Sequence, residues 1–121
     1  MFAYKTKSKI KKKVDFKTNN LDSELFHEWR KHPNLHGWMR DLYYKKGGEK
    51  DSFNCVPVKL TQEDINQLAN DILDGKLPET EGFFFGTSMG DKDEENYDLE
   101  FCKKASDAIK NDENIYYTSW W

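Results

Sequence analysis

The feature that most constrains the fold of this chain is a succession of short segments that alternate between the period of a β-strand and that of an α-helix. Strand patterns occupy residues 1–17, 53–60, 82–86 and 114–121, and helix patterns occupy residues 22–31, 33–46, 61–75 and 97–110. Alternation of this kind favours a layered fold over an all-helical or all-strand one. We predict an α/β or α+β fold, in which a small single-layer sheet of three to four strands packs with three to four helices. The predicted order is β-α-α-β-α-β-α-β.

Aromatic residues supply much of the core that such a fold needs. The 18 Phe, Tyr and Trp residues outnumber the 17 Leu, Ile and Val residues, and each ring buries a large area. A length of 121 residues fits a single α/β domain, at residues 21–121, behind a basic strand or arm at residues 1–20. No apolar run approaches the ~20 residues of a membrane-spanning helix, and the start lacks the apolar stretch of a secretory signal. We expect no membrane partner.

Residues 1–17 are unusual because lysine occupies nearly every second position. Successive side chains of a strand point to opposite faces, so one face would carry lysines and the other mostly apolar or β-forming residues. The segment has a net charge of +6, which leaves −9 for the other 104 residues. Three interpretations remain open: an edge strand protected by its lysines, a strip that binds phosphate or acidic groups, and a flexible arm. The candidate nucleic-acid contacts are Lys5, Lys7, Lys9, Lys11 and Lys13.

Local signals place the ends of the predicted helices. Asp22 or Ser23 can cap a short helix that runs to about residue 31. Pro33 suits the first turn of a second helix, which Gly47-Gly48 ends. The sequence Thr61-Gln62-Glu63-Asp64 resembles a capping box at the start of the third helix.

Other residues indicate where the strands lie. Pro57 cannot donate a hydrogen bond within a sheet, so its strand is predicted to lie at an edge or to contain a bulge. Residues 82–86 are apolar on both faces, which suggests a central strand. Cys55 and Cys102 stand in apolar patterns and are interpreted as reduced core residues, which points to a cytosolic location.

Functional side chains are concentrated between residues 29 and 39, where tryptophan, histidine and basic residues lie close together. Arginine and lysine can hold a phosphate or carboxylate, and an indole can stack on a ligand. His32 and His36 are four residues apart, but Pro33 separates them and no third ligand is apparent, so we predict no metal and no cofactor. The candidate ligand- or partner-binding residues are Trp29, Arg30, Lys31, His32, His36, Trp38, Asn54, Trp120 and Trp121.

No motif of an enzyme class is present. The chain lacks a phosphate-binding loop, a dinucleotide fingerprint and a nucleophile elbow. The acidic run at residues 91–96 lacks the glycine and the final glutamate of a calcium loop. We therefore assign no catalytic residue, and the sequence leans toward a protein that is not an enzyme.

Several strings resemble a family of small proteins that tailed bacteriophages and some bacteria carry. The strings are Trp29-Arg30-Lys31-His32-Pro33-Asn34-Leu35-His36-Gly37-Trp38-Met39, Phe53-Asn54-Cys55-Val56, Gly82-Phe83-Phe84-Phe85-Gly86 and Ser119-Trp120-Trp121. Some members are labelled phosphoglycerate kinase, but this chain is far too short for that two-domain enzyme and has no nucleotide loop. The resemblance implies a phage accessory protein made in the cytoplasm of the bacterial host.

These observations give three hypotheses about function. The leading one is an accessory protein that binds a host component without catalysis, either a host protein or an anionic small molecule such as a nucleotide signal. The second is a small enzyme acting on a phosphorylated metabolite, with His32 or His36 as the acid–base group. The third is nucleic-acid binding through the lysine strip, which predicts an affinity that falls steeply with salt.

Overall fold

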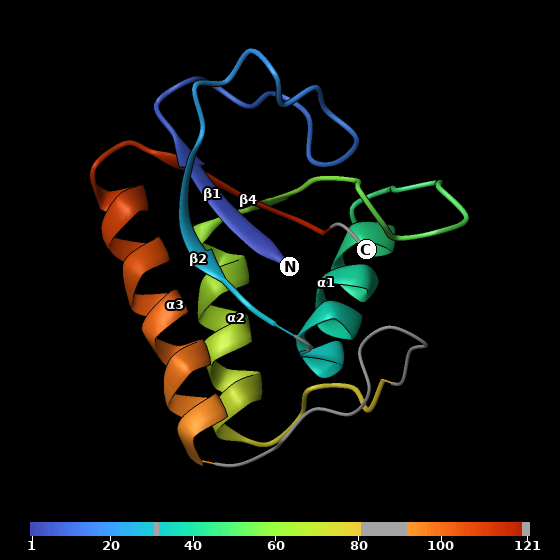
Figure 1. The fold of residues 1–121 in the computed structure, drawn as a ribbon, viewed down its shortest axis with the longest axis vertical. Helices are drawn as coiled ribbons and strands as arrows, with labels where there is room; N and C mark the ends of the chain where they lie inside the picture. The colour runs from blue at the N-terminus through green and yellow to red at the C-terminus, as the bar shows by residue number, and fades with distance from the viewer. Residues whose placement is uncertain (31, 81–91, 120–121) are drawn as a thin grey trace.

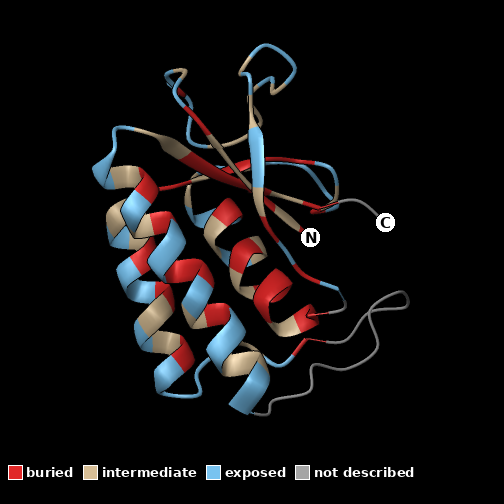
Figure 2. Ribbon diagram, turned by 60° about the vertical axis from the view of Figure 1, so that its left-hand side comes forward, coloured by how far each residue is buried: buried red, intermediate tan, exposed pale blue. Residues whose placement is uncertain are grey.

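Four strands and three helices make up the described part of the computed structural model, which covers residues 1–30, 32–80 and 92–119. The elements are β1 (Phe2–Thr6), β2 (Glu24–Glu28), α1 (Pro33–Lys45), β3 (Val58–Leu60), α2 (Gln62–Leu73), α3 (Lys92–Lys110) and β4 (Asn114–Thr118). The strands form one antiparallel sheet in the order β2-β1-β4-β3. The helices cover one face of this sheet (Figures 1 and 2). The predicted fold class is confirmed, in its α+β form.

The core lies between the sheet and the helices. Ile115 and Tyr117 of β4 face the helices, opposite Leu60 and Val58 of β3. The helices contribute Leu35, Met39, Tyr43, Ile65, Leu68, Ile72, Phe101, Cys102, Ala105 and Ala108. Because side chains alternate along a strand, the residues between these core positions lie on the helix-free face of the sheet.

The predicted starts of two helices are confirmed. The side chain of Thr61 accepts a hydrogen bond from the Asp64 N–H, while the Asp64 carboxylate accepts one from the Thr61 N–H at 2.8 Å, which completes a capping box on α2. Helix α1 begins at Pro33 as expected, and the glycine pair follows its end, with Gly47 at a φ of 98°. That left-handed conformation favours glycine and stops the helix.

Residues 22–31 were predicted as a helix, and this prediction is wrong. Its middle part forms β2 (Glu24–Glu28), which pairs with β1 from Phe2↔Glu28 onward, with a shift of register between Ala3 and Tyr4. Asp22, the expected helix cap, has a φ of 46°, a left-handed conformation rather than the extended one of a cap. The pairing of β2 with β1 joins distant parts of the chain, and this long-range contact overrides the local helix signals.

Residues 1–17 do not form one strand either. β1 ends at Thr6 and lies inside the sheet, so the edge-strand interpretation of this segment is wrong. The chain then forms a loop that returns along the outer edge of β3. There the Asp15 N–H donates to the carbonyl of Pro57 at 3.1 Å, and the Lys59 N–H donates to the carbonyl of Lys13 at 2.9 Å. β3 is the edge strand that Pro57 predicted, and the backbone of the loop covers that edge.

The remaining predictions have mixed outcomes. Cys102 is buried, and burial raises the pKa of its thiol to about 12, whereas Cys55 is exposed and is not a core residue. The strand predicted at residues 82–86 lies outside the described residues. Among the helices that are described, none combines the length and the apolar character needed to cross a membrane.

Candidate functional site

The residues singled out from the sequence are divided among separate places. Trp29 and His32 bind the same carboxylate, that of Asp98, whereas His36 and Trp38 have other partners. The described members of the set are the buried Trp29, His32 and His36, the half-buried Trp38 and Asn54, and the exposed Arg30, while Lys31, Trp120 and Trp121 lie outside the described residues.

Asp98 of α3 is the centre of a buried polar cluster. Its Oδ1 accepts a hydrogen bond from the indole N–H of Trp29 at 2.9 Å, and its Oδ2 lies 2.7 Å from Nε2 of His32. The Asp98 side chain is 2% exposed. Trp29 directly follows β2, His32 directly precedes α1 and Asp98 lies in the first half of α3, so the cluster joins three parts of the fold.

His36 has a different role, as a neutral group inside the core. Its Nε2–H donates to the carbonyl of Phe53 at 3.0 Å, so its Nδ1 accepts from the hydroxyl of Tyr117 at 2.8 Å. Burial lowers the pKa of His36 to about 4, against the opposing effect of the Phe53 carbonyl. This imidazole is therefore uncharged at neutral pH and serves as a structural link between α1 and β4.

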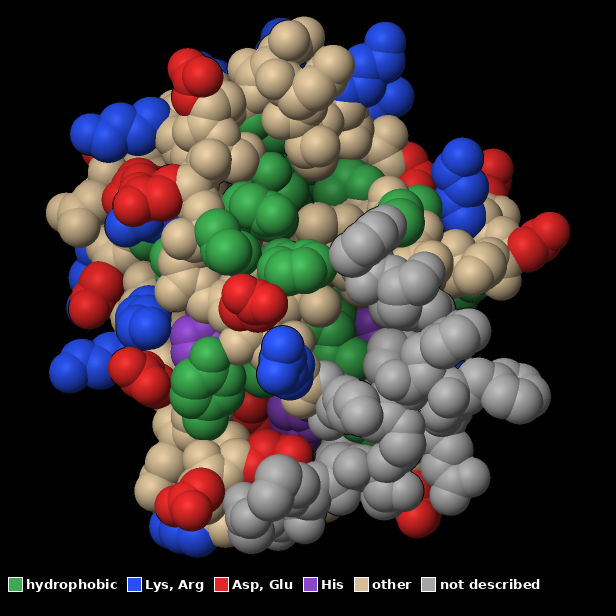
Figure 3. All heavy atoms as spheres, in the orientation of Figure 1, with side chains coloured by type: hydrophobic (Ala, Val, Ile, Leu, Met, Phe, Trp, Pro, Cys, Tyr) green, Lys and Arg blue, Asp and Glu red, His purple; other side chains and the backbone are tan. Residues whose placement is uncertain are grey.

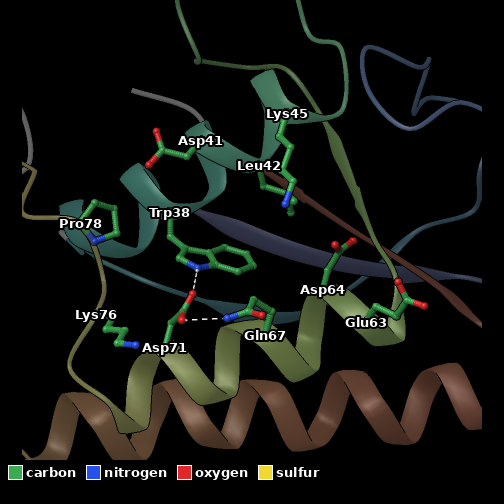
Figure 4. Close-up of a pocket in the computed structure, with 10 residues that line it drawn as sticks. All are labelled: Trp38, Asp41, Leu42, Lys45, Glu63, Asp64, Gln67, Asp71, Lys76 and Pro78. Atoms are coloured by element: carbon green, nitrogen blue, oxygen red, sulfur yellow. Dashed lines mark hydrogen bonds between the residues drawn. The ribbon is translucent and has the colours of Figure 1, made fainter.

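Trp38 stands in an open groove of about 540 Å³ between α1 and α2 (Figure 4). Its indole N–H donates to Oδ2 of Asp71 at 2.8 Å, and the Gln67 amide donates to Oδ1 of the same carboxylate at 2.9 Å. The other lining residues are Asp41, Leu42, Lys45, Glu63, Asp64, Lys76 and Pro78. Because carboxylates outnumber lysines, the groove does not favour an anionic ligand.

Aromatic rings gather on the helix-free face of the sheet. Tyr4 of β1 stacks on Tyr116 of β4 with ring centroids 5.2 Å apart, and Phe16 meets Tyr116 edge-on at 5.5 Å. Phe2 lies 6.4 Å from Tyr4. Tyr116 is covered, but Phe2, Tyr4 and Phe16 are half-buried and keep part of their surface open. Figure 3 shows a patch of hydrophobic side chains in the upper middle of the molecule, with both basic and acidic side chains at its margins.

Residues 7–17, which we call the basic loop, present their lysines outward. Ile10 is buried, and its carbonyl accepts a hydrogen bond from the Lys59 ammonium at 3.0 Å. Asp15, the one acidic residue of the loop, accepts from the hydroxyl of Tyr43 at 2.8 and 2.9 Å. The exposed lysines are Lys7, Lys9, Lys11, Lys12, Lys13 and Lys17, while Lys5 in β1 is half-buried and pairs with Glu24 at 3.7 Å.

Sequence reasoning missed both Asp98 and the aromatic face. One signal for Asp98 was available, since it precedes Cys102 by one helical turn and so continues the inward stripe of α3. The alternation of Phe2 and Tyr4 was visible too. Their placement beside Tyr116 was not, because it depends on the pairing of β1 with β4.

Comparison with known proteins adds no relative. No protein-family model matches this chain, and no curated protein or solved structure matches it significantly.

Proposed function

We propose that this protein binds single-stranded nucleic acid, with the helix-free sheet face as the surface for bases and the basic loop as the surface for phosphates. The observation that carries the proposal is the juxtaposition of half-buried rings with a loop that exposes six lysines. Phe16 belongs to both parts, because it lies in the basic loop and contacts Tyr116 on the sheet.

The chemistry of the two parts suits an unpaired strand. Bases stack on aromatic rings with a gain of about 1–3 kcal/mol each, whatever their identity. Lysines attract the phosphates, and binding releases counterions into solution. Stacking needs bases that are free of a duplex, so a surface with partly open aromatic rings favours a single strand over a double helix.

The alternatives draw less support from the contacts. For a small phosphate, Arg30 is the candidate arginine that the structure describes, and the acidic Glu28 lines the same hollow. An acid–base role at neutral pH does not suit His36, whose pKa is about 4. Binding of nucleic acid remains compatible with the phage accessory role that the family resemblance implies.

A first experiment tests the phosphate surface by fluorescence anisotropy with a labelled single-stranded oligonucleotide over a range of salt concentrations. Replacing Lys11 and Lys12 with glutamine should weaken binding and make the plot of log affinity against log salt shallower by about 1.4, at about 0.7 per phosphate contact. The matched control replaces Lys103 and Lys110, two exposed lysines of α3, and should leave the slope unchanged. Equal losses in the two double variants would refute the proposal.

A second experiment tests the stacking surface with the same oligonucleotide. Tyr4→Leu keeps an apolar side chain but removes the ring, and it should lower affinity by about fivefold or more without changing the salt slope. Tyr44→Leu, at an exposed tyrosine of α1, is the control. Unchanged affinity in the Phe2→Leu/Tyr4→Leu double variant, or tighter binding to the matching duplex, would contradict the assignment of this face.

A further inference from the structure

A second site lies where β2 leads into α1 and packs against the first half of α3. His32 immediately precedes α1, and Glu94 and Asp98 lie one turn apart on α3, so their side chains share a face of that helix. Nε2 of His32 is 2.7 Å from Oδ2 of Asp98 and 3.7 Å from Oε1 of Glu94. We propose that these three side chains bind a divalent transition-metal ion.

The distances between the donor atoms fit one ion. Each of the three side chains offers one ligand atom, and these atoms all lie within 4.8 Å of one another. Metal–ligand bonds of about 2.0–2.2 Å place two ligands of the same ion about 3–3.5 Å apart. The observed 2.7 and 3.7 Å separations lie on either side of that range, so small rotations of the side chains bring the atoms to metal-binding distances.

The donor set selects the kind of ion. One imidazole nitrogen with two carboxylate oxygens suits Zn²⁺, Mn²⁺ or Fe²⁺, whereas Ca²⁺ and Mg²⁺ prefer oxygen ligands alone. A metal-bound histidine is neutral, so the two carboxylates balance the two charges of the ion. The burial of His32 and Asp98, at 3% and 2% exposure, strengthens this attraction because water screens it little.

The surroundings provide both support and access. The Trp29 indole N–H holds Oδ1 of Asp98, which leaves Oδ2 directed toward His32, and hydrogen bonds of this kind orient metal ligands. Glu94 and Asp98 also line a cavity of about 260 Å³ together with Asn34, Ile72 and Leu77. Three protein ligands beside a cavity leave a coordination position for water or a small ligand. Figure 3 shows histidine and acidic side chains close together below the middle of the molecule.

The sequence predicted no metal because Pro33 separates His32 from His36 and no third ligand was apparent. His36 binds Tyr117 and Phe53 instead. The other two ligands come from α3, more than sixty residues further along the chain, and their spacing of four residues is common in any charged helix. None of these three residues belongs to the helix-free sheet face or to the basic loop, so the metal proposal does not depend on the nucleic-acid proposal.

To test the proposal, the full chain without an affinity tag is titrated with Zn²⁺. Native mass spectrometry gives the number of ions bound per chain, and NMR follows the ¹⁵N resonances of the imidazole rings. We expect one Zn²⁺ per chain, with a shift of the His32 Nε2 resonance that is complete at one equivalent and no comparable shift at His36. Absence of binding by both Zn²⁺ and Mn²⁺, or binding that leaves His32 unmoved, would overturn the proposal.

Charge-removing variants separate a built site from general attraction to acidic residues. Glu94→Gln and Asp98→Asn should each weaken Zn²⁺ binding by about tenfold or more. Glu100→Gln, at an exposed glutamate of α3 outside the cavity, should change it less than about twofold. Circular dichroism checks the fold of each variant. If Asp98→Asn does not fold, Glu94→Gln alone decides the test, and an affinity for this variant equal to that of Glu100→Gln would disprove the site.

Discussion

Among single residues, Tyr117 makes a hydrogen bond to His36 that is buried in the core. Its side chain is fully buried, and burial raises the pKa of its phenol well above the ordinary value. The neutral hydroxyl donates to Nδ1 of His36, whose Nε2–H is used by the Phe53 carbonyl. Both side chains are buried, and buried polar groups are almost always hydrogen-bonded, so this bond matters for stability.

Tyr117→Phe should therefore lower the free energy of unfolding by about 1–3 kcal/mol, because it leaves Nδ1 of His36 buried without its donor. Tyr44→Phe is the matched control, since the Tyr44 hydroxyl bonds a backbone carbonyl at the exposed surface, where water can replace it. Urea denaturation measures both. Equal stability of the two variants would show that the buried hydrogen bond contributes nothing.

Helix α2 begins with the capping box that the sequence predicted, and its contribution can be measured. Thr61→Ala removes the acceptor for the Asp64 N–H and should destabilise the protein by about 1 kcal/mol. Thr61→Ser keeps the acceptor and should lose less than half of that amount. Urea denaturation of the two variants distinguishes a capping effect from any general sensitivity at this position.

Helix α1 packs closely against Pro78 and Thr80, in the segment after α2, at Gly37, which has no side chain. A Cβ atom at this position would lie 2.1 Å from Oγ1 of Thr80, an overlap that the packed segment cannot accept without moving. Gly37→Ala should therefore destabilise the protein by about 1–3 kcal/mol, although alanine favours a helix by up to about 1 kcal/mol.

The control for that prediction relieves the overlap. In the Gly37→Ala background, Thr80→Gly removes the side chain that the new methyl group meets. Thermal unfolding should show part of the lost stability restored relative to Gly37→Ala alone. A melting temperature of Gly37→Ala equal to or above that of the wild type would contradict the close packing.

The elements that the sequence predicted well are those with local causes. The apolar stripe of α1, its glycine stop and the Thr61 cap all act within a few residues, and each is found in the structure. β2 was mistaken for a helix because its pairing partner β1 lies about twenty residues away. The short length of β1 has a similar cause, since the loop after Thr6 is fixed by contacts with β3 and β4.

At the scale of the whole molecule, two buried histidines tie stability to pH. Burial lowers the pKa of His27 to about 4, with a smaller contribution from Lys104, and burial lowers that of His36 to about 4 as well. Their pKa in the unfolded chain is about 6.5, so the unfolded state binds more protons below that pH. Stability is therefore greatest above pH 6.5 and decreases as the pH falls toward 4.

Urea denaturation at pH 7.5 and pH 5 should show a loss of up to about 2 kcal/mol for each histidine. His27 packs among Trp29, Tyr97 and Phe101, and no described group forms a hydrogen bond with its ring nitrogens. His27→Phe should therefore fold at pH 7.5 and lose less stability on acidification than the wild type. An unchanged pH dependence in this variant would contradict a neutral His27.

The fold class was predictable because it depends on the number and period of the segments, whereas the site depends on which strands become neighbours. The sequence contains the lysines and the rings of Phe2, Tyr4 and Tyr116, but only the pairing of β1 with β4 brings the rings together. Likewise, no local pattern joins His32 to α3. Long-range strand pairing therefore limited the prediction of function more than that of architecture.

The placement of β1 beside β4 also has a consequence for biosynthesis. These two strands form the middle of the sheet, yet about a hundred residues separate them in the sequence. Until the ribosome has released β4, β1 has an unpaired side, and Ile115 and Tyr117 are missing from the core. Contacts this distant in sequence slow folding, so the sheet is completed late, and the unpaired side of β1 is open to aggregation until β4 has emerged.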